Sequence, residues 1–382
     1  MKIKKYIRQL LPVVVFAAII FGLTGGSIFS QKQEYSASEK RVLQTMPKLR
    51  WKAVKKGRFQ TKYETYLADQ FPGRDSWVRV QTDVSRMFGK TESNGVYFGK
   101  DDYLLEHYEA SDFENSQAEK NEAALAKFVK KMSRKRRVSV MLVPTKTWIM
   151  QEKLPAFAPT YDEQQMYDRM EQQLGGLADT VLVPAASELK KHTDEQIYYR
   201  TDHHWTTLGA WYGYLAYVEA NGGDIAQAQK KREFQCVSSQ FYGSSYAKIN
   251  QAPRADEIDV YEPMQPLTVV YNMGEKTTDT LYDASFLDTQ DQYSYFTGGN
   301  QPVIEVTGGS ANGRTLLIIK DSFANSMLPF LAEDYEKVVM VDLRQLNIKC
   351  RDLVKMFDPT DVLVLYNTAQ FAGDREFAMK CR

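Results

Sequence analysis

The sequence is poor in cysteine and histidine. Its 382 residues include three cysteines, Cys236, Cys350 and Cys381, and four histidines. Three cysteines at these spacings match no metal-binding pattern and no dense disulfide framework, so at most one disulfide bridge can form. The sequence leaves open whether it does.

The chain also lacks an excess of charge of either sign. Lysine and arginine nearly balance aspartate and glutamate, which gives a formal net charge of +1. A nucleic-acid-binding protein would carry a basic surplus, so we expect no nucleic-acid partner. With 43% apolar and 25% charged residues, the composition is that of a globular protein with enough length for a core.

Outside the N-terminus the chain has no long apolar run. The segment from Leu10 to Phe29 is uncharged and follows a basic stretch, Met1 to Arg8. About twenty such residues can span a bilayer as a helix, with the basic end in the cytoplasm. We expect residues 1–30 to be a membrane anchor, since no clear Ala-x-Ala cleavage site follows; a cleaved signal sequence or a buried helix are the alternatives. The remaining chain would lie outside the cytoplasm, or be secreted if the segment is removed.

Residues 31–94 are predicted to form a polar stalk followed by a helical lead-in. Two helices are expected within Gly57–Phe88, broken where Pro-Gly marks a turn at Phe71–Asp75. A hairpin is expected at Gly95–Glu106, where apolar residues flank a Gly-Lys-Asp-Asp turn.

Residues 95–382 alternate between short apolar runs and amphipathic segments, which predicts an α/β fold with a mostly parallel sheet. The expected strands are Val138–Val143, Val181–Val183, Thr315–Ile319, Val338–Val341 and Val362–Leu365. The expected helices are Ser116–Arg134, Asp162–Leu174, Ala185–Lys191, Thr207–Ala220, Phe323–Leu331 and Gln345–Met356. Residues 236–313 are rich in Tyr, Thr, Asp and Gly and are predicted to form a β-rich insertion.

Ser322 follows the apolar run Leu316–Ile319 after Lys320 and Asp321, and an expected helix begins at the next residue. A serine at the carboxyl end of a buried strand is where α/β folds carry nucleophiles, and helix amides can stabilise an oxyanion there. The alternative is that Ser322 only caps the helix.

A second stretch, Tyr199 to Trp211, favours the catalytic interpretation. In an extended segment residues i and i+2 share a face, which would bring Asp202 beside His204 and turn His203 away. An aspartate can orient a histidine and stabilise its protonated form, so this pair lacks only a hydroxyl nucleophile such as Ser322.

Several motifs in the same order resemble the DHHW family, which is similar to the alginate O-acetyltransferase group of SGNH-hydrolase-like enzymes. The tetrapeptide Asp202-His203-His204-Trp205 carries the resemblance, together with a set of flanking motifs. These are Glu39-Lys40-Arg41 with Leu43 and Pro47, FPGRD at Phe71–Asp75, GVYFGKDDYLLE at Gly95–Glu106, VPTK at Val143–Lys146 and KDSF at Lys320–Phe323.

The resemblance implies a three-layer α/β/α fold in which Asp202 orients, His204 acts as base and Ser322 acts as nucleophile. It implies O-acyl transfer, in particular acetyl transfer, to or from a cell-surface polysaccharide, with a membrane-bound O-acyltransferase as acyl supplier. It implies no cofactor. One departure is that SGNH enzymes carry glycine where this chain has Lys320, so a side chain could crowd the oxyanion site.

Further candidates line the expected crevice. Asn367 is a candidate second oxyanion donor, and Lys146 and Arg74 are candidate ligands for an anionic group or structural residues. Trp205 is expected to fix the loop beside His204, with stacking on the substrate as the alternative. The first alternative function is a non-catalytic glycan-binding or scaffold protein, whose insertion aromatics Tyr242, Tyr246, Tyr293, Tyr295 and Phe296 stack on sugars instead of serving as ordinary strand residues. The second is a metal site of Asp202, His203, His204 and His192, which we disfavour because adjacent histidines on an extended segment diverge.

Overall fold

The computed structural model describes residues 2–36, 41–252 and 254–382. The motif residues Glu39 and Lys40 lie outside these ranges. Contacts divide the chain into two compact units, of which the first holds Met1–Gly89 with Lys248–Gln251 and the second holds Lys90–Ala247 with Ala252–Arg382.

The first unit consists of helices and one short strand pair. Its elements are α1 (Lys2–Phe29), β1 (Tyr35–Ser36), β2 (Arg41–Val42), α2 (Trp51–Lys55), α3 (Arg58–Asp69) and α4 (Arg74–Met87). Helix α1 contains one window, Leu10–Ser27, that is long and apolar enough to cross a membrane. This fits the expected signal anchor. The two helices predicted within Gly57–Phe88 are confirmed, and they separate at Gly73, whose positive φ of 66° suits glycine.

An eight-stranded sheet organises the second unit, in the order β11-β10-β12-β14-β13-β15-β6-β7. Its strands are β6 (Arg137–Val143), β7 (Thr180–Leu182), β10 (Thr268–Tyr271), β11 (Lys276–Thr278), β12 (Val303–Thr307), β13 (Thr315–Lys320), β14 (Lys337–Val341) and β15 (Asp361–Asn367). The five strands from β14 to β7 pair in parallel. All five predicted strands are therefore confirmed.

The sheet is mixed, with four parallel and three antiparallel pairings, so its larger part is parallel as expected. Strands β12, β10 and β11 extend it by antiparallel pairing beside β14. They come from the β-rich segment 236–313, which therefore contributes three strands to the main sheet. Strands β8 (Gln235–Phe241) and β9 (Asp256–Val260), also from this region, pair with each other outside the main sheet.

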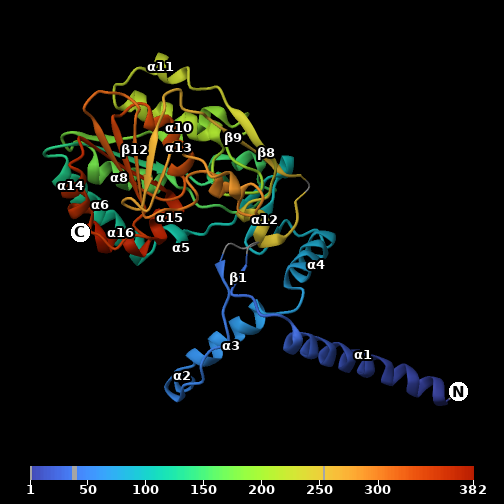
Figure 1. Ribbon diagram of the computed structural model, residues 1–382. Helices are drawn as coiled ribbons and strands as arrows, with labels where there is room; N and C mark the ends of the chain where they lie inside the picture. Colours follow the sequence, from blue (N-terminus) through green and yellow to red (C-terminus); the bar gives the residue numbers. More distant parts are fainter. Residues whose placement is uncertain (1, 37–40, 253) are drawn as a thin grey trace. The chain divides into compact units, whose positions relative to one another are not determined.

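Helices cover both faces of the sheet (Figure 1). Side chains alternate along each strand, so Leu316 and Ile318 of β13 enter one core while Leu317 and Ile319 enter the other. The first core packs under α9 (Ala185–Leu189), α10 (Thr207–Ala220) and α13 (Ala324–Ala332). The second packs under α6 (Ser116–Met132), α8 (Gln164–Leu174), α14 (Cys350–Phe357), α15 (Thr368–Gly373) and α16 (Arg375–Lys380).

The remaining elements of the second unit are short. They are β3 (Glu92–Ser93), β4 (Val96–Phe98), β5 (Leu104–Glu106), α5 (Ala110–Phe113), α7 (Lys146–Ile149), α11 (Ile225–Gln229) and, reaching into the first unit, α12 (Ser244–Ile249). Strands β4 and β5 form the predicted hairpin. Helix α14 begins five residues later than expected, and α15 and α16 were not expected.

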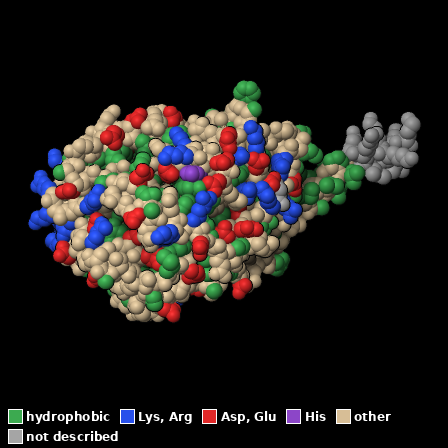
Figure 2. Space-filling model, turned by 90° about the horizontal axis from the view of Figure 1, so that it is seen from above, with side chains coloured by type: hydrophobic (Ala, Val, Ile, Leu, Met, Phe, Trp, Pro, Cys, Tyr) green, Lys and Arg blue, Asp and Glu red, His purple; other side chains and the backbone are tan. Residues whose placement is uncertain are grey.

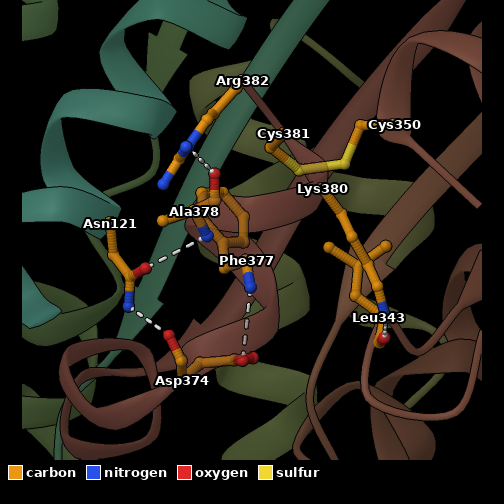
Figure 3. Close-up of a disulfide and its surroundings, with 9 residues drawn as sticks. All are labelled: Asn121, Leu343, Cys350, Asp374, Phe377, Ala378, Lys380, Cys381 and Arg382. Carbon is orange, nitrogen blue, oxygen red and sulfur yellow. Dashed lines mark hydrogen bonds between the residues drawn. A yellow bond between two sulfur atoms is a disulfide. The ribbon is translucent and has the colours of Figure 1, made fainter. Parts of the chain in front are cut away.

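The one possible disulfide forms between Cys350 and Cys381 (Figure 3). It ties α14 to the end of α16. Asn121 of α6 holds the same segment, because its amide donates to the Asp374 carbonyl and its oxygen accepts from the Ala378 amide. The C-terminus is thus fastened to the helical layer on one face of the sheet.

Charged side chains of both signs are interspersed on the face seen in Figure 2. That distribution agrees with the net charge of +1.

Candidate active site

Ser322, His204 and Asp202 form a continuous chain of hydrogen bonds. Ser322 lies in the turn between β13 and α13, and its Oγ is 2.7 Å from His204 Nε2. The other ring nitrogen of His204, Nδ1, is 2.6 Å from Asp202 Oδ1. Since an ionised carboxylate only accepts, Nδ1 carries the proton and Nε2 of the neutral ring accepts from the serine hydroxyl. This is the arrangement in which an imidazole can remove the serine proton.

Asp202 is completely buried, and three donors converge on its carboxylate. The His204 ring and the His204 amide donate to Oδ1, and the Ser244 amide donates to Oδ2 over 2.7 Å. A buried carboxylate is stable as an anion only when it is paired in this way. The surrounding backbone therefore fixes both the charge and the direction of Asp202.

The prediction that residues 202–204 are extended is wrong, although Asp202 and His204 do meet. The segment bends, because the Asp202 side chain accepts the backbone amide of His204 two residues on, as in an Asx turn. His203 consequently does not point away. Its ring centroid lies 3.9 Å from that of His204, and its Nδ1 bonds to the Ser244 hydroxyl.

Ser322 does not cap α13. Phe323 is the residue that caps the helix, and its backbone amide donates to the Asp321 side chain over 2.9 Å. The Ser322 amide donates no hydrogen bond within the part of the chain that the structure describes. It is therefore available to an oxyanion.

A cavity of about 270 Å³ opens beside Ser322, beyond the carboxyl ends of β13 and β15. It is lined by Tyr108, His203, Asp321, Ser322, Phe323, Asn367, Ala369, Gln370 and Gly373. This is the crevice position expected for an α/β sheet. A larger hollow of about 730 Å³ lies at the opposite ends of the strands, beside Arg137 and Arg314, and shares no lining residue with the site.

Asn367 and Asp321 join the two strand ends at this cavity. The Asn367 amide nitrogen of the backbone donates to Asp321 Oδ2 over 2.7 Å, and its side-chain Nδ2 donates to the Val143 carbonyl. Asn367 carries a second Nδ2 hydrogen, which has no acceptor among the described residues. Burial raises the pKa of the Asp321 carboxyl.

Lys320, the residue that was expected to crowd the oxyanion site, is not part of the cavity lining. It is fully buried, and its ammonium donates to Asn300 and Asn325 and lies 3.5 Å from Asp342. Burial lowers its pKa to about 8. The expected crowding of the oxyanion site is therefore absent.

Lys146 and Arg74 make contacts other than those expected of anion ligands. The Lys146 ammonium is buried and donates to the carbonyl oxygens of Tyr199 and Asp202, so it braces the loop that carries the Asp-His pair. Arg74 belongs to the first unit, where its guanidinium lies 3.7 Å from Asp75. Neither residue lines the cavity beside Ser322.

Trp205 is fully buried and joins the Asp-His loop to the serine turn. Its indole N–H donates to the Phe323 carbonyl over 3.0 Å and to the Ser326 hydroxyl over 2.9 Å. These bonds fix the separation between the residues on either side, His204 and Ser322.

Tyr293 completes the site from the β-rich segment. Its ring stacks on His204 with centroids 3.8 Å apart and an interplanar angle of 9°, and its hydroxyl donates to the Ser322 carbonyl over 3.1 Å. Tyr293, Tyr295 and Phe296 are buried in one aromatic cluster, so they do not offer a sugar-stacking surface. Sequence reasoning could not find this contact, because no local pattern links residue 293 to residue 204.

Gly243 is a further residue that sequence reasoning missed. A Cβ built on it would lie 2.2 Å from Asp202 Cβ and 2.3 Å from Oδ2. Only glycine allows the backbone to approach closely enough for the next amide, that of Ser244, to reach Asp202. The Tyr242-Gly243-Ser244-Ser245 stretch offered a turn signal but not its target.

The ring and carboxylate atoms of Asp202, His203 and His204 lie within 4.8 Å of one another, as a small metal site would require. Both ring nitrogens of His204 are engaged, one by Asp202 and one by Ser322. His192, the fourth ligand of the metal hypothesis, instead stacks on Tyr212 with centroids 3.5 Å apart. The geometry thus favours orientation of His204 by Asp202 over metal coordination.

Comparison with known proteins places these features in a family. Residues 90–341 match the DHHW protein family. The chain is 25% identical over 271 residues to the probable alginate O-acetylase AlgJ of Pseudomonas syringae pv. tomato, an alignment that covers 68% of this chain and 61% of that protein. The chain thus spans less than two thirds of this relative's length.

Two solved structures share the fold. A DHHW family protein from Eubacterium siraeum superposes with a TM-score of 0.61 and 25% identity, covering 76% of this chain and 96% of that one. Bacillus cereus PatB1, solved with a sulfonyl adduct, gives a TM-score of 0.59 and 21% identity, covering 74% and 96%. The family match includes the Asp-His loop and Ser322 and extends over more than half of the sequence, and the chain therefore belongs to the DHHW protein family.

Proposed function

We propose that this protein is an extracytoplasmic O-acyl transferase or esterase, acting most simply on acetyl groups of a cell-surface polysaccharide. The observation that carries the proposal is the hydrogen-bonded chain Ser322–His204–Asp202 beside a cavity at the strand ends. The similarity to a probable alginate O-acetylase supports acetyl as the group and a polysaccharide as the acceptor.

In the first half-reaction Ser322 Oγ attacks the acyl carbonyl while His204 Nε2 takes its proton. Asp202 stabilises the imidazolium that results. The free amide of Ser322 and the second Nδ2 hydrogen of Asn367 would bind the oxyanion of the tetrahedral intermediate. His204 then returns the proton to the departing oxygen, and an acyl-serine remains.

In the second half-reaction a sugar hydroxyl attacks the carbonyl carbon of the acyl-serine while His204 takes the hydroxyl proton. As the bond between the acyl group and Ser322 Oγ breaks, His204 returns that proton to Ser322 Oγ, and the polymer leaves acylated. Water in place of the sugar would make the protein an esterase. Trp205, Tyr293 and Lys146 act as positioning residues, because each holds the loop or ring of the Asp-His pair without reaching the cavity.

The remaining organisation follows from this function. Residues 1–30 would anchor or export the chain, 31–94 would lead into the enzyme, and 95–382 would form an SGNH-hydrolase-like catalytic domain of three layers. A membrane-bound O-acyltransferase would supply the acyl group on the outer side. If the anchor is retained the protein is single-pass; if it is cleaved the protein is secreted.

The proposal is tested by incubating the protein with a chromogenic acetyl ester, with and without an acetyl-free polysaccharide such as polymannuronate. We expect chromophore release that Ser322→Ala and His204→Ala abolish. Acetyl appearing on the polymer identifies a transferase, and free acetate alone identifies an esterase. A folded wild type with no turnover above the two variants would contradict the proposal, and chelator-sensitive turnover would favour the metal site.

A further inference from the structure

Helix α4 of the first unit carries its apolar side chains on its outer face. Its exposed apolar residues are spaced three or four positions apart, with one adjacent pair at the end, so they lie on one stripe of the helix. They are Trp77, Val80, Val84, Met87 and, directly after the helix, Phe88. Their exposed fractions are 51%, 49%, 42%, 76% and 75%. Isolated exposed apolar residues are ordinary, but a continuous stripe of five marks an interaction surface.

The polar face of the same helix is the one that packs. Thr82 is buried and donates to the Ile249 carbonyl over 3.0 Å, and Asp83 accepts from Gln251 over 2.6 Å. These partners belong to the segment 248–251 of the same unit. The helix therefore uses its polar side within the protein and leaves its apolar side free, the reverse of a helix that packs on a core.

Most other exposed large apolar side chains beyond α1 also lie in the first unit. They are Val42, Met46, Leu49, Trp51, Tyr63, Leu67 and Phe71. Arg79 and Arg86 are exposed on the polar face of α4, away from the stripe. An apolar stripe with tryptophan, opposite a polar face that carries arginine, is the composition of a helix that lies in the surface of a bilayer.

Chain connectivity keeps α4 close to the end of α1. Gln33, four residues after α1, exchanges hydrogen bonds of 3.0 and 2.8 Å with Gln70, which precedes α4 by four residues. Two four-residue links and one side-chain contact allow at most about 35 Å between the end of α1 and the start of α4. If α1 spans the bilayer, α4 is held within reach of its outer surface.

We infer that α4 is an interfacial helix whose Trp77–Phe88 stripe lies in the outer surface of the membrane that α1 crosses. The occupant is lipid, and the polar face that carries Arg79 and Arg86 stays on the water side. This second attachment goes beyond the proposed function and beyond a simple anchor. It restricts the motion of the first unit at the membrane.

The test uses the full-length protein reconstituted in vesicles of phosphatidylcholine and phosphatidylglycerol. Cys236→Ser removes the free thiol, and one nitroxide is attached at Val84→Cys on the stripe or at Arg79→Cys on the opposite face. Collisions with oxygen, which concentrates in lipid, and with a water-soluble nickel chelate report the surroundings of each label. A third label at Ala17→Cys reports whether α1 is inserted.

We expect the ratio of oxygen collisions to nickel-chelate collisions to be several-fold higher for the label at position 84 than for the label at position 79. The label at position 17 should show the high ratio of a site inside the lipid. Equal exposure to water at 84 and 79, with 17 in lipid, would overturn the inference. A label at 84 that is shielded from both agents would also overturn it, because the stripe would then pack on protein. A label at 17 outside lipid would overturn it through loss of the anchor. None of these results depends on catalytic activity.

Discussion

Replacing Gly243 by alanine should disable the site without removing any reacting group. The added Cβ would start 2.2 Å from Asp202 Cβ and 2.3 Å from Oδ2, whereas real Cβ contacts are at least 3.0 Å. The atoms in the way belong to the buried Asp202 side chain, and one of them is its Cβ, which cannot move without the backbone. Asp202 itself must therefore shift. That movement lengthens its bonds to the Ser244 amide and to His204 Nδ1, now 2.7 and 2.6 Å.

A misplacement on the scale of 1 Å in a catalytic group costs on the order of 100-fold in rate. This corresponds to about 2.7 kcal/mol of transition-state stabilisation. Overpacking itself should lower the free energy of unfolding by about 1–3 kcal/mol, so the variant should still fold. We would measure kcat/KM on a chromogenic acetyl ester together with urea unfolding.

Two further variants isolate the mechanism. Ser244→Ala keeps the amide that binds Asp202 and should stay within a few-fold of wild type. Asp202→Gly removes the Cβ and the carboxylate that the new methyl group would meet. The double variant Asp202→Gly with Gly243→Ala should therefore have nearly the same kcat/KM as Asp202→Gly alone. A folded Gly243→Ala protein with wild-type kcat/KM, or full additivity with Asp202→Gly, would refute the argument that Gly243 acts through Asp202.

Three other outcomes follow from the structure. Tyr293→Phe keeps the ring on His204 but loses the hydrogen bond to the Ser322 carbonyl, so kcat/KM should fall about fivefold, which corresponds to one hydrogen bond. Tyr293→Leu also removes the ring and should lower kcat/KM further. Equal ester-hydrolysis activities of the wild type and both variants would contradict this prediction. Burial raises the pKa of Glu163 from 4.5 to about 7, so the contribution of this carboxyl to stability is complete below pH 4.5 and lost as pH rises through 7. Relative to Glu163→Gln, the wild-type protein should therefore lose about 3 kcal/mol of unfolding free energy between pH 4.5 and 7. Urea unfolding at several pH values that shows the same pH dependence for both proteins would contradict this prediction. Cys350→Ser with Cys381→Ser opens a loop with a sequence separation of 31 and should cost about 3–4 kcal/mol in urea unfolding, with a loss below 1 kcal/mol as the contrary result.

The elements that sequence patterns predicted well are those whose partners are close in the chain or whose burial is continuous. The apolar runs at Val138–Val143 and Thr315–Ile319 were predicted to be strands, and both lie buried within the sheet. The mixed character of the sheet could not be predicted. Val303–Val306 alternates like any strand, and nothing local tells it to pair antiparallel with β14.

The candidate site divides in the same way. Asp202 and His204 are neighbours in sequence, so their meeting was expected, although a bend and not an extended segment produces it. Tyr293 and Gly243 act on those residues across 89 and 41 positions, and only the folded chain brings them together. Lys320 is a third case. Its size suggested crowding of the oxyanion site, but its hydrogen bonds to Asn300 and Asn325 hold the side chain outside the cavity lining.

The central claim, that Ser322 becomes acylated with His204 as its base, is tested most directly by intact-protein mass spectrometry. The protein would be mixed with an acetyl ester, quenched in acid within seconds, and digested to locate the modification. We expect a mass gain of one acetyl group on the peptide that contains Ser322, absent in Ser322→Ala and strongly reduced in His204→Ala. A folded wild type that gains no acetyl group, or gains it equally in all three proteins, would contradict the account and favour a non-catalytic, glycan-binding role.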